Sequence, residues 1–169
     1  MHLFLPLVTI SLFYSSLVFS QSPALDTYNK AVFFEIGGLG PVYSFDFEGL
    51  IRRNFNLTYN YRIGVSLLPD AIAVPVGINV FDTFGDHHFQ MNVGLTPYVK
   101  KYRTLSIKGS ETLLYAGGGI GYRYQKQDGK WFWGVGVNPM VRLDPSLSEI
   151  IGPDPRFILS GNLAAGFRW

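Results

Sequence analysis

The chain has 169 residues, no cysteine and a formal net charge of +2. This is the length of one domain, and the absence of cysteine excludes disulfides, thiolate catalysis and lipid attachment through an N-terminal cysteine. Charged residues make up only 15% of the chain, against about a quarter of a soluble domain, while aromatic residues make up 16% and glycines number 19. This composition favours a β-barrel over a helical core, and the scattered cations give no basis for nucleic-acid binding.

The first twenty residues resemble an export signal. From Leu3 to Phe19 the chain is apolar apart from Pro6 and a few hydroxyl residues, and Ser20 offers a small residue for cleavage. A signal peptide is therefore predicted, although Met1-His2 lacks the usual basic residue. A single transmembrane helix is the alternative, because the stretch is close to the minimum of about 17 residues. The predicted organisation is a signal peptide, a short N-terminal segment and an outer-membrane barrel, at 1–20, 21–30 and 31–169.

After residue 30, apolar and polar residues alternate with a period of two. From Leu57 to Leu67 every odd position is apolar or aromatic, and every even position from 56 to 66 is polar or small. Such alternation indicates strands with one apolar face. Phe84-Gly85-Asp86 and Asp128-Gly129 are typical of hairpin turns, the second of a two-residue type I′ turn. The expected strands are 31–39, 42–51, 55–68, 71–82, 87–100, 112–126, 130–142 and 156–169.

The two faces differ in a way that predicts a membrane barrel. A soluble barrel of the lipocalin kind would carry many lysines and acids on its outer face, whereas the second face here is mostly Gly, Ser, Thr, Asn and Ala. Small side chains suit the narrow interior of an eight-stranded barrel. The fold predicted is an all-β, eight-stranded, antiparallel up-and-down transmembrane barrel with the small polar face inside.

Six charged residues within the strands fall on this small face. A lipid-facing Arg or Lys at mid-depth costs about 2–4 kcal/mol, so such charges belong in the lumen. Three acids and three arginines there can neutralise one another. We expect a structural ion-pair network, with a proton relay or ion path as the alternative. Its members are Glu35, Asp46, Glu48, Arg62, Arg123 and Arg168.

Loop lengths and aromatic residues orient the barrel. If the N-terminus begins in the periplasm, the connections near 52–54, 83–86 and 127–129 are short and periplasmic. Those near 101–111 and 143–155 are long and external, as in outer-membrane barrels. Trp and Tyr prefer the headgroup level of a membrane. A periplasmic aromatic girdle is therefore expected from Tyr122, Tyr124, Trp131, Trp133, Phe167 and Trp169.

Several strand motifs carry a resemblance to known proteins. They are Phe33-Phe34-Glu35-Ile36-Gly37-Gly38, Tyr43-Ser44-Phe45-Asp46-Phe47-Glu48, Tyr61-Arg62-Ile63-Gly64-Val65-Ser66 and Ile120-Gly121-Tyr122-Arg123-Tyr124. With them, the mature chain resembles the small eight-stranded outer-membrane β-barrel proteins of Bacteroidetes-type bacteria. The terminal Gly166-Phe167-Arg168-Trp169 resembles the aromatic strand that barrel-assembly machinery recognises in such proteins. The resemblance implies a fold and an outer-membrane location, with no activity.

Candidate chemistry is weak. Gly117 to Gly121 lies within a predicted strand, so a narrow barrel wall is a better interpretation than a phosphate loop. His87 and His88 are neighbours on opposite faces and lack a third ligand, which favours a turn over a metal site. Ser106 and Ser110 lie at the opposite end from both histidines. We predict no catalytic, metal-binding or cofactor-binding residue and no enzymatic activity.

The function expected is an outer-membrane protein with a packed polar lumen that acts structurally or through its external loops, at 100–111 and 144–156. Two alternatives stay open. One is a lipid-modifying enzyme of the lipid A acyltransferase or deacylase type, and the other is a narrow ion or solute channel. The expected partners are outer-membrane lipid and the barrel-assembly machinery, without nucleic acid, and the sequence does not identify an external ligand.

Overall fold

The structure is a computed structural model that describes residues 28–104, 107–143 and 156–169. The expected signal peptide, most of the expected 21–30 segment and nearly all of the expected loop at 143–155 lie outside the described residues. Within these ranges no helix is long and apolar enough to cross a membrane.

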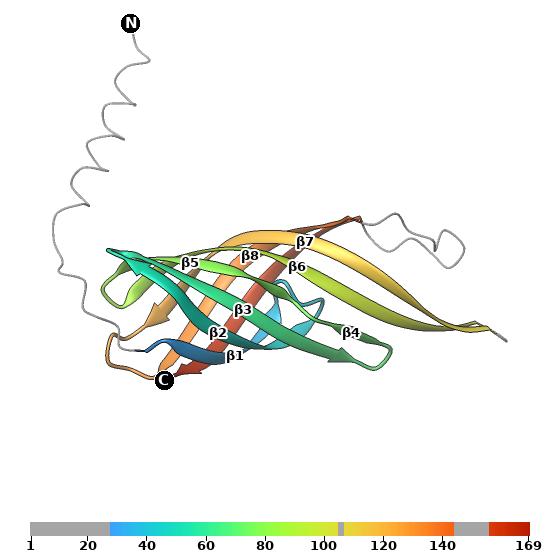
Figure 1. Ribbon diagram of the computed structural model, residues 1–169, viewed down its shortest axis with the longest axis horizontal. Helices are drawn as coiled ribbons and strands as arrows, with labels where there is room; N and C mark the ends of the chain where they lie inside the picture. Colours follow the sequence, from blue (N-terminus) through green and yellow to red (C-terminus); the bar gives the residue numbers. More distant parts are fainter. Residues whose placement is uncertain (1–27, 105–106, 144–155) are drawn as a thin grey trace, which may run out of the picture.

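Nine β-strands make up the described fold (Figure 1). They are β1 (Lys30–Gly37), β2 (Tyr43–Asn54), β3 (Leu57–Leu68), β4 (Ala71–Ala73), β5 (Val76–Phe84), β6 (His87–Thr104), β7 (Ile107–Gln125), β8 (Trp131–Arg142) and β9 (Phe157–Arg168). β4 and β5 are two parts of one barrel strand, because both pair with β3 on one side and β6 on the other. The break between them contains Pro75, which has no N–H to donate to the ladder.

The strands close into an antiparallel barrel. With β4 and β5 counted as one, each strand pairs with its sequence neighbours, and β1 closes the ring by pairing with β9, where Ala31 lies opposite Arg168. The all-β, eight-stranded, up-and-down fold predicted from the alternation is thereby confirmed. We call the end that carries Lys30 and Trp169 the terminal end, and the opposite end, where β6 joins β7, the hairpin end (Figure 1).

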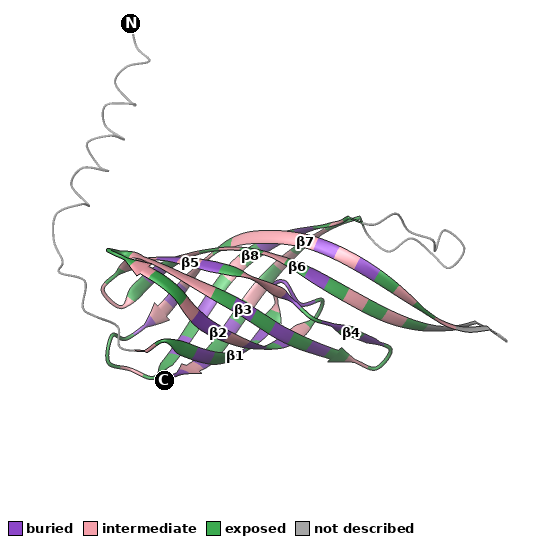
Figure 2. Cartoon of the chain, in the orientation of Figure 1, coloured by how far each residue is buried: buried purple, intermediate pink, exposed green. Residues whose placement is uncertain are grey.

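Burial alternates along the strands (Figure 2), and the polar face is the buried one. On β3, Arg62 is 2% exposed while its neighbour Ile63 is 48% exposed. Large apolar side chains such as Val93 and Leu163 point outward along the barrel wall. The lipocalin-like alternative, which has the apolar face inside, is therefore wrong. The predicted small polar face does line the lumen.

The longest hairpin differs from the prediction. Residues 101–111 were expected to form a long loop, but β6 continues to Thr104 and β7 begins at Ile107, with these two residues paired at the end of the ladder. The basic residues near Lys100 interrupt the apolar alternation that marks strands in a membrane. A hairpin that extends beyond the closed ring of strands is held together by its own ladder hydrogen bonds, so its residues need not alternate.

The turns at the terminal end also differ from one another. Gly85-Asp86 joins β5 to β6 as a two-residue hairpin turn, and Gly85 has the positive φ of 65° that such a turn requires. The type I′ turn expected at Asp128-Gly129 is wrong, because neither residue has a positive φ. The connection is wider, and the Gly129 N–H donates to the Lys126 carbonyl at 3.1 Å.

Candidate functional site

Arg62 is the centre of one ion-pair cluster in the lumen. Its Nε donates to Asp46 Oδ1 at 2.7 Å, and both terminal nitrogens donate to the Glu35 carboxylate. Ser44 Oγ donates to the second oxygen of Asp46 at 2.5 Å. All four side chains are buried. The fork of the guanidinium therefore satisfies two carboxylates that would be costly to bury alone.

Arg123 forms a second cluster, with Glu48. Its two terminal nitrogens bind the two oxygens of Glu48 at 2.9 and 3.1 Å. The guanidinium carbon lies 4.2 Å from the ring centre of Phe81 and 4.1 Å from that of Phe132. These rings stabilise the cation through their faces and keep water from it.

The two clusters are adjacent. Glu48 lies opposite Arg62 in the β2–β3 ladder, and the ring of Phe33 is 5.0 Å from the Arg62 guanidinium carbon and 5.8 Å from that of Arg123. The structure thus brings together five of the six residues expected in the lumen.

Arg168, the sixth, lies at the terminal end. Its side chain is buried and donates to backbone carbonyls of Lys126, Gln127 and Gly129, with 3.0 Å to Gln127 and 2.8 Å to Gly129. Its guanidinium carbon is 4.7 Å from the ring centre of Tyr28. Arg168 therefore holds the turn between β7 and β8, a role that sequence reasoning did not assign.

Amide side chains complete the clusters, and the sequence interpretation did not single them out. Asn60 and Asn79 donate to the two oxygens of Glu48 at 2.9 and 2.6 Å, and Asn162 donates to Glu35 at 2.6 Å. Their positions on the small face were visible in the alternation. What the alternation could not show is which strands bring an amide within reach of a carboxylate.

Leu39 closes the lumen from the hairpin end. It belongs to the connection between β1 and β2, is fully buried, and its carbonyl accepts from Thr96 Oγ1 at 2.9 Å. Its two methyl groups lie where side chains at Gly94 and Gly117 would stand, 2.8 and 2.9 Å from their ideal Cβ positions. Glycine is needed at both positions because Leu39 occupies the space.

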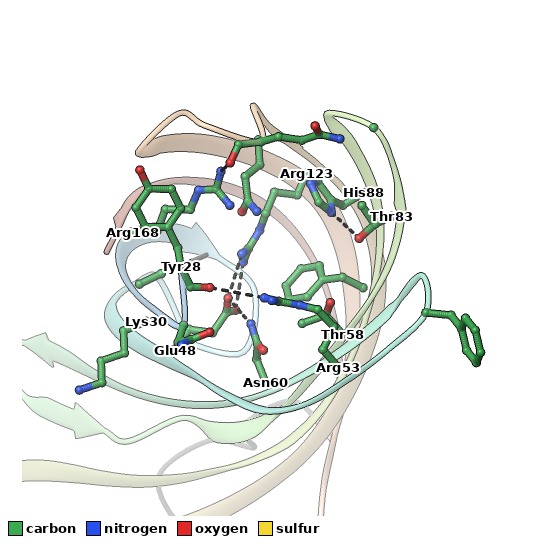
Figure 3. A pocket seen from close by; sticks show the side chains of 17 residues that line it. Tyr28, Lys30, Glu48, Arg53, Thr58, Asn60, Thr83, His88, Arg123 and Arg168 are labelled. Atoms are coloured by element: carbon green, nitrogen blue, oxygen red, sulfur yellow. Dashed lines mark hydrogen bonds and ion pairs between the residues drawn. The ribbon is translucent and has the colours of Figure 1, made fainter. Parts of the chain in front are cut away.

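The terminal end of the lumen contains a cavity of about 70 Å³. Figure 3 looks into it: Glu48 and Asn60 lie at its inner wall, with Arg123 reaching toward Glu48 and with Thr83 and His88 on the other side. The charged residues of its wall are basic apart from Glu48. Because the cavity touches Glu48, it connects the outside of the barrel at this end with the second ion-pair cluster.

The histidines and the glycine run lie as the alternation places them. His88 is buried beside Thr83 Oγ1, at 2.9 Å from its Nδ1, whereas His87 is exposed and lies 2.5 Å from the Tyr122 hydroxyl. Gly117 to Gly121 lies inside β7 and not at a helix. Among the described residues no group of three or more His, Cys, Asp or Glu side chains is arranged to hold a metal.

The aromatic residues expected as a girdle lie on the outer wall near the terminal end. Tyr122 and Tyr124 pack on Trp133 with ring centres 5.7 and 5.9 Å apart. Trp131 packs on Phe167 at 5.3 Å. Phe167 continues to Trp169 at 6.4 Å, and Trp169 continues to Phe47 at 6.3 Å. These residues therefore form two ring clusters on neighbouring strands.

Comparisons with known proteins concern the fold. No family model matches the chain, and no curated protein matches it. The chain is similar to the N-terminal β-barrel domain of OprF from Pseudomonas aeruginosa, with a TM-score of 0.55 and 12% identity over 83% of this chain and 96% of that one. Neisserial surface protein A gives a TM-score of 0.43 and 16% identity over 83% of this chain and 92% of that one. The chain is thus an eight-stranded barrel like those of outer-membrane proteins.

Proposed function

We propose that this chain is exported by its N-terminal signal peptide and inserted into a bacterial outer membrane, where it binds an anionic partner through the β6–β7 hairpin and catalyses no reaction. An outer wall of apolar side chains around a charged interior supports the membrane location. The terminal end, with its short turns and aromatic girdle, then faces the periplasm, and the hairpin end faces outward.

The observation that carries the binding role is the length of the hairpin. β6 is held by its neighbour as far as Lys101, whose N–H donates to the Asp70 carbonyl at 2.7 Å. β7 is held as far as Leu114, whose carbonyl accepts from Leu143 N–H at 2.8 Å. Beyond these points the β6–β7 ladder continues to Thr104 without pairing to any other described strand. Figure 1 shows this hairpin extending well past the rest of the barrel.

The charge of the hairpin indicates the class of partner. From Lys100 to Glu111 the hairpin carries four cations, Lys100, Lys101, Arg103 and Lys108, against the single acid Glu111, which lies opposite Lys100 in the ladder. Each Lys or Arg near an anionic surface contributes about 1 kcal/mol to binding. The anionic headgroups and sugar phosphates of a bacterial surface match this charge, so lipopolysaccharide is the probe to use first.

The test compares two sets of charge removals in protein held in phosphatidylcholine nanodiscs. Replacing the four hairpin cations by glutamine is expected to weaken binding of lipopolysaccharide vesicles by more than about tenfold. The matched control replaces four cations at the terminal end, Lys30, Arg52, Lys126 and Lys130, by glutamine and should bind as the unmodified protein does. Equal loss in both sets, or no binding by the unmodified protein, would contradict the proposal.

A closed lumen supports a protein that is not a channel. Leu39 fills the hairpin side of the lumen, and the ion pairs of Arg62 and Arg123 cross its middle. We expect planar bilayers containing the folded protein to show no current above background. Stable single-channel steps would favour the channel alternative.

The separation of reactive side chains supports a protein that is not an enzyme. His88 lies near the terminal end of β6, whereas Ser110 pairs with Lys101 near the hairpin end. Thirteen residues of strand separate the two levels, about 40 Å at the usual rise of 3.3 Å per residue. Lipid A from cells that overproduce the protein should therefore have unchanged acylation by mass spectrometry. A change that disappears in a Ser110→Ala variant would favour the enzyme alternative.

A further inference from the structure

We propose that the lumen binds one alkali-metal cation, with water completing its coordination, among the side-chain carbonyl oxygens of five inward-facing asparagines. We call these residues the asparagine cluster. Its members are Asn60, Asn79, Asn92, Asn138 and Asn162. They come from β3, β5, β6, β8 and β9, so they surround much of the lumen.

The cluster presents five buried oxygens that receive no hydrogen bond. Within the described part of the chain, no group donates to the Oδ1 atom of any member. Asn79 is 0% exposed and Asn138 is 1% exposed, and for Asn138 the amide nitrogen is also without a bond. Leaving a buried polar atom unsatisfied costs about 1–3 kcal/mol. Five such oxygens in one lumen indicate a bound species that interacts with oxygen.

The orientation of three of these amides is fixed by their partners. Asn60 and Asn79 donate their nitrogens to Glu48, and Asn162 donates its nitrogen to Glu35. A carboxylate accepts hydrogen bonds and cannot receive one from a carbonyl oxygen. Each of the three oxygens must therefore point away from its carboxylate, toward the remaining space.

The strand register makes the cluster contiguous. Asn60 lies opposite Asn79, and Asn79 lies opposite Asn92, so neighbouring side chains on the lumen face are about 5 Å apart at Cβ. Asn92 lies opposite Gly119. A Cβ at Gly119 would stand 2.2 Å from Asn138 Oδ1, so this oxygen lies directly over the glycine.

The Oδ1 atom of Asn162 likewise lies over a glycine, Gly136. A Cβ at Gly136 would stand 2.6 Å from Asn162 Oδ1. Glycine at positions 119 and 136 therefore leaves the space that these two carbonyl oxygens occupy on the lumen side of the strands.

The charge balance of the adjacent ion pairs favours a cation. Glu35, Asp46 and Glu48 contribute three negative charges to the two clusters, and Arg62 and Arg123 contribute two positive charges. The clusters thus carry one excess negative charge, which is costly in a buried environment. One monovalent cation at the neighbouring carbonyl oxygens balances it.

The ligand type indicates an alkali cation. Carbonyl oxygens and water are the ligands of hard cations, and rings of carbonyls replace the hydration shell of alkali ions in filters. The cluster offers neutral oxygens without the nitrogen or sulfur ligands that transition metals prefer. The cavity at the terminal end is the entry to the cluster, because Asn60 and the acid Glu48 line it, although its other charged lining residues are basic. Leu39 seals the other side.

The first experiment locates the ion directly. The full mature chain is refolded in detergent with thallium(I) nitrate, which replaces K⁺ and scatters anomalously, and is crystallised in the same salt. We expect an anomalous peak bounded by the Asn138 oxygen and at least two other oxygens of the cluster. Density for water alone, with no anomalous peak in the lumen, would overturn the proposal.

The second experiment uses Asn138, whose amide bonds to no described protein group. If the cation is bound, unfolding should occur several degrees higher in KCl or NaCl than in N-methylglucamine chloride of equal ionic strength. Asn138→Leu should abolish this difference, while Asn56→Leu, at an exposed turn, should keep it.

Two results of this comparison would contradict the cation. One is an unmodified protein that is equally stable in all three salts, and the other is an Asn138→Leu variant that keeps the full dependence. If Asn138→Leu fails to fold, Asn138→Ser replaces it with the same expectation.

Discussion

The lumen and the outer wall of this barrel are made by the same strands but stabilised by different interactions. Arg62 and Ile63 are adjacent on β3, yet the first is 2% exposed and forms specific bonds to Glu35 and Asp46, while the second is 48% exposed. If lipid surrounds the wall, as proposed, a residue there has to be apolar, whatever its neighbours are. A lumen residue has to match its partners. Substitutions should therefore depend on partners inside the barrel and on polarity alone outside it.

The largest effect is expected at Arg62. Replacing it by methionine keeps much of its length but leaves Glu35 and Asp46 buried without their cation, which should lower the free energy of unfolding by about 3–5 kcal/mol. Urea titration of the protein in detergent, followed by tryptophan fluorescence, measures the change.

Two variants show whether the loss comes from the ion pair. Arg52→Met removes an exposed arginine and should change the free energy of unfolding by less than about 0.5 kcal/mol. Adding Glu35→Gln to Arg62→Met removes one uncompensated charge and should restore part of the stability. Equal stability of Arg62→Met and Arg52→Met would mean that the clusters do not stabilise the lumen.

The next largest effect is expected on the outer wall at Val93. This side chain is 61% exposed and lies near the middle of the barrel part of β6. Val93→Arg places a charge against lipid, at a cost of about 2–4 kcal/mol near the bilayer centre. Folding into phosphatidylcholine vesicles with urea titration measures the cost, and Val93→Leu is the apolar control. If Val93→Arg folds as well as the control, lipid does not surround this face.

The sequence predicts which residues lie on the outer wall and which in the lumen, but it does not predict which lumen residues pair, and the reason is physical. Alternation places Glu48, Arg62 and Arg123 on the inner face, because neighbouring residues point to opposite sides of a strand. Pairing is a different matter: Glu48 and Arg123 are 75 positions apart, and three acids with three arginines on one face allow several pairings. The chosen one depends on strand register and tilt, which no local pattern contains.

Residues outside the alternation were the hardest to assign. Leu39 reads as an ordinary apolar residue at a strand end, yet its place inside the barrel depends on Gly94 and Gly117, on two distant strands. Arg168 was grouped with the ion pairs by its face alone, although the β7–β8 turn lies beside it. The roles of Leu39 and Arg168 can be assigned only when the positions of all the strands in the closed barrel are known.

A smaller effect is expected at Arg123, where the shape of the cation matters as well as its charge. Arg123→Lys keeps the positive charge beside Glu48 but loses the two-pronged bond and the flat contact with Phe81 and Phe132. This should lower the free energy of unfolding by about 1–2 kcal/mol. The control is the opposite exchange, Lys130→Arg, at the rim of the barrel, which should not change the free energy of unfolding measurably. A neutral Arg123→Lys would mean that charge alone holds this cluster.

The smallest effect, and the only expected gain, is at the β2–β3 turn. Phe55 has a φ of 48° and is 85% exposed. A left-handed backbone costs most residues about 1–2 kcal/mol, and asparagine tolerates it better. Phe55→Asn should therefore raise the free energy of unfolding by about 0.5–1 kcal/mol in detergent. Phe84→Asn, on the neighbouring strand β5, relieves no such backbone and should destabilise. If Phe55→Asn lowers the free energy of unfolding in vesicles but raises it in detergent, the Phe55 side chain anchors the barrel at the headgroup level of the bilayer.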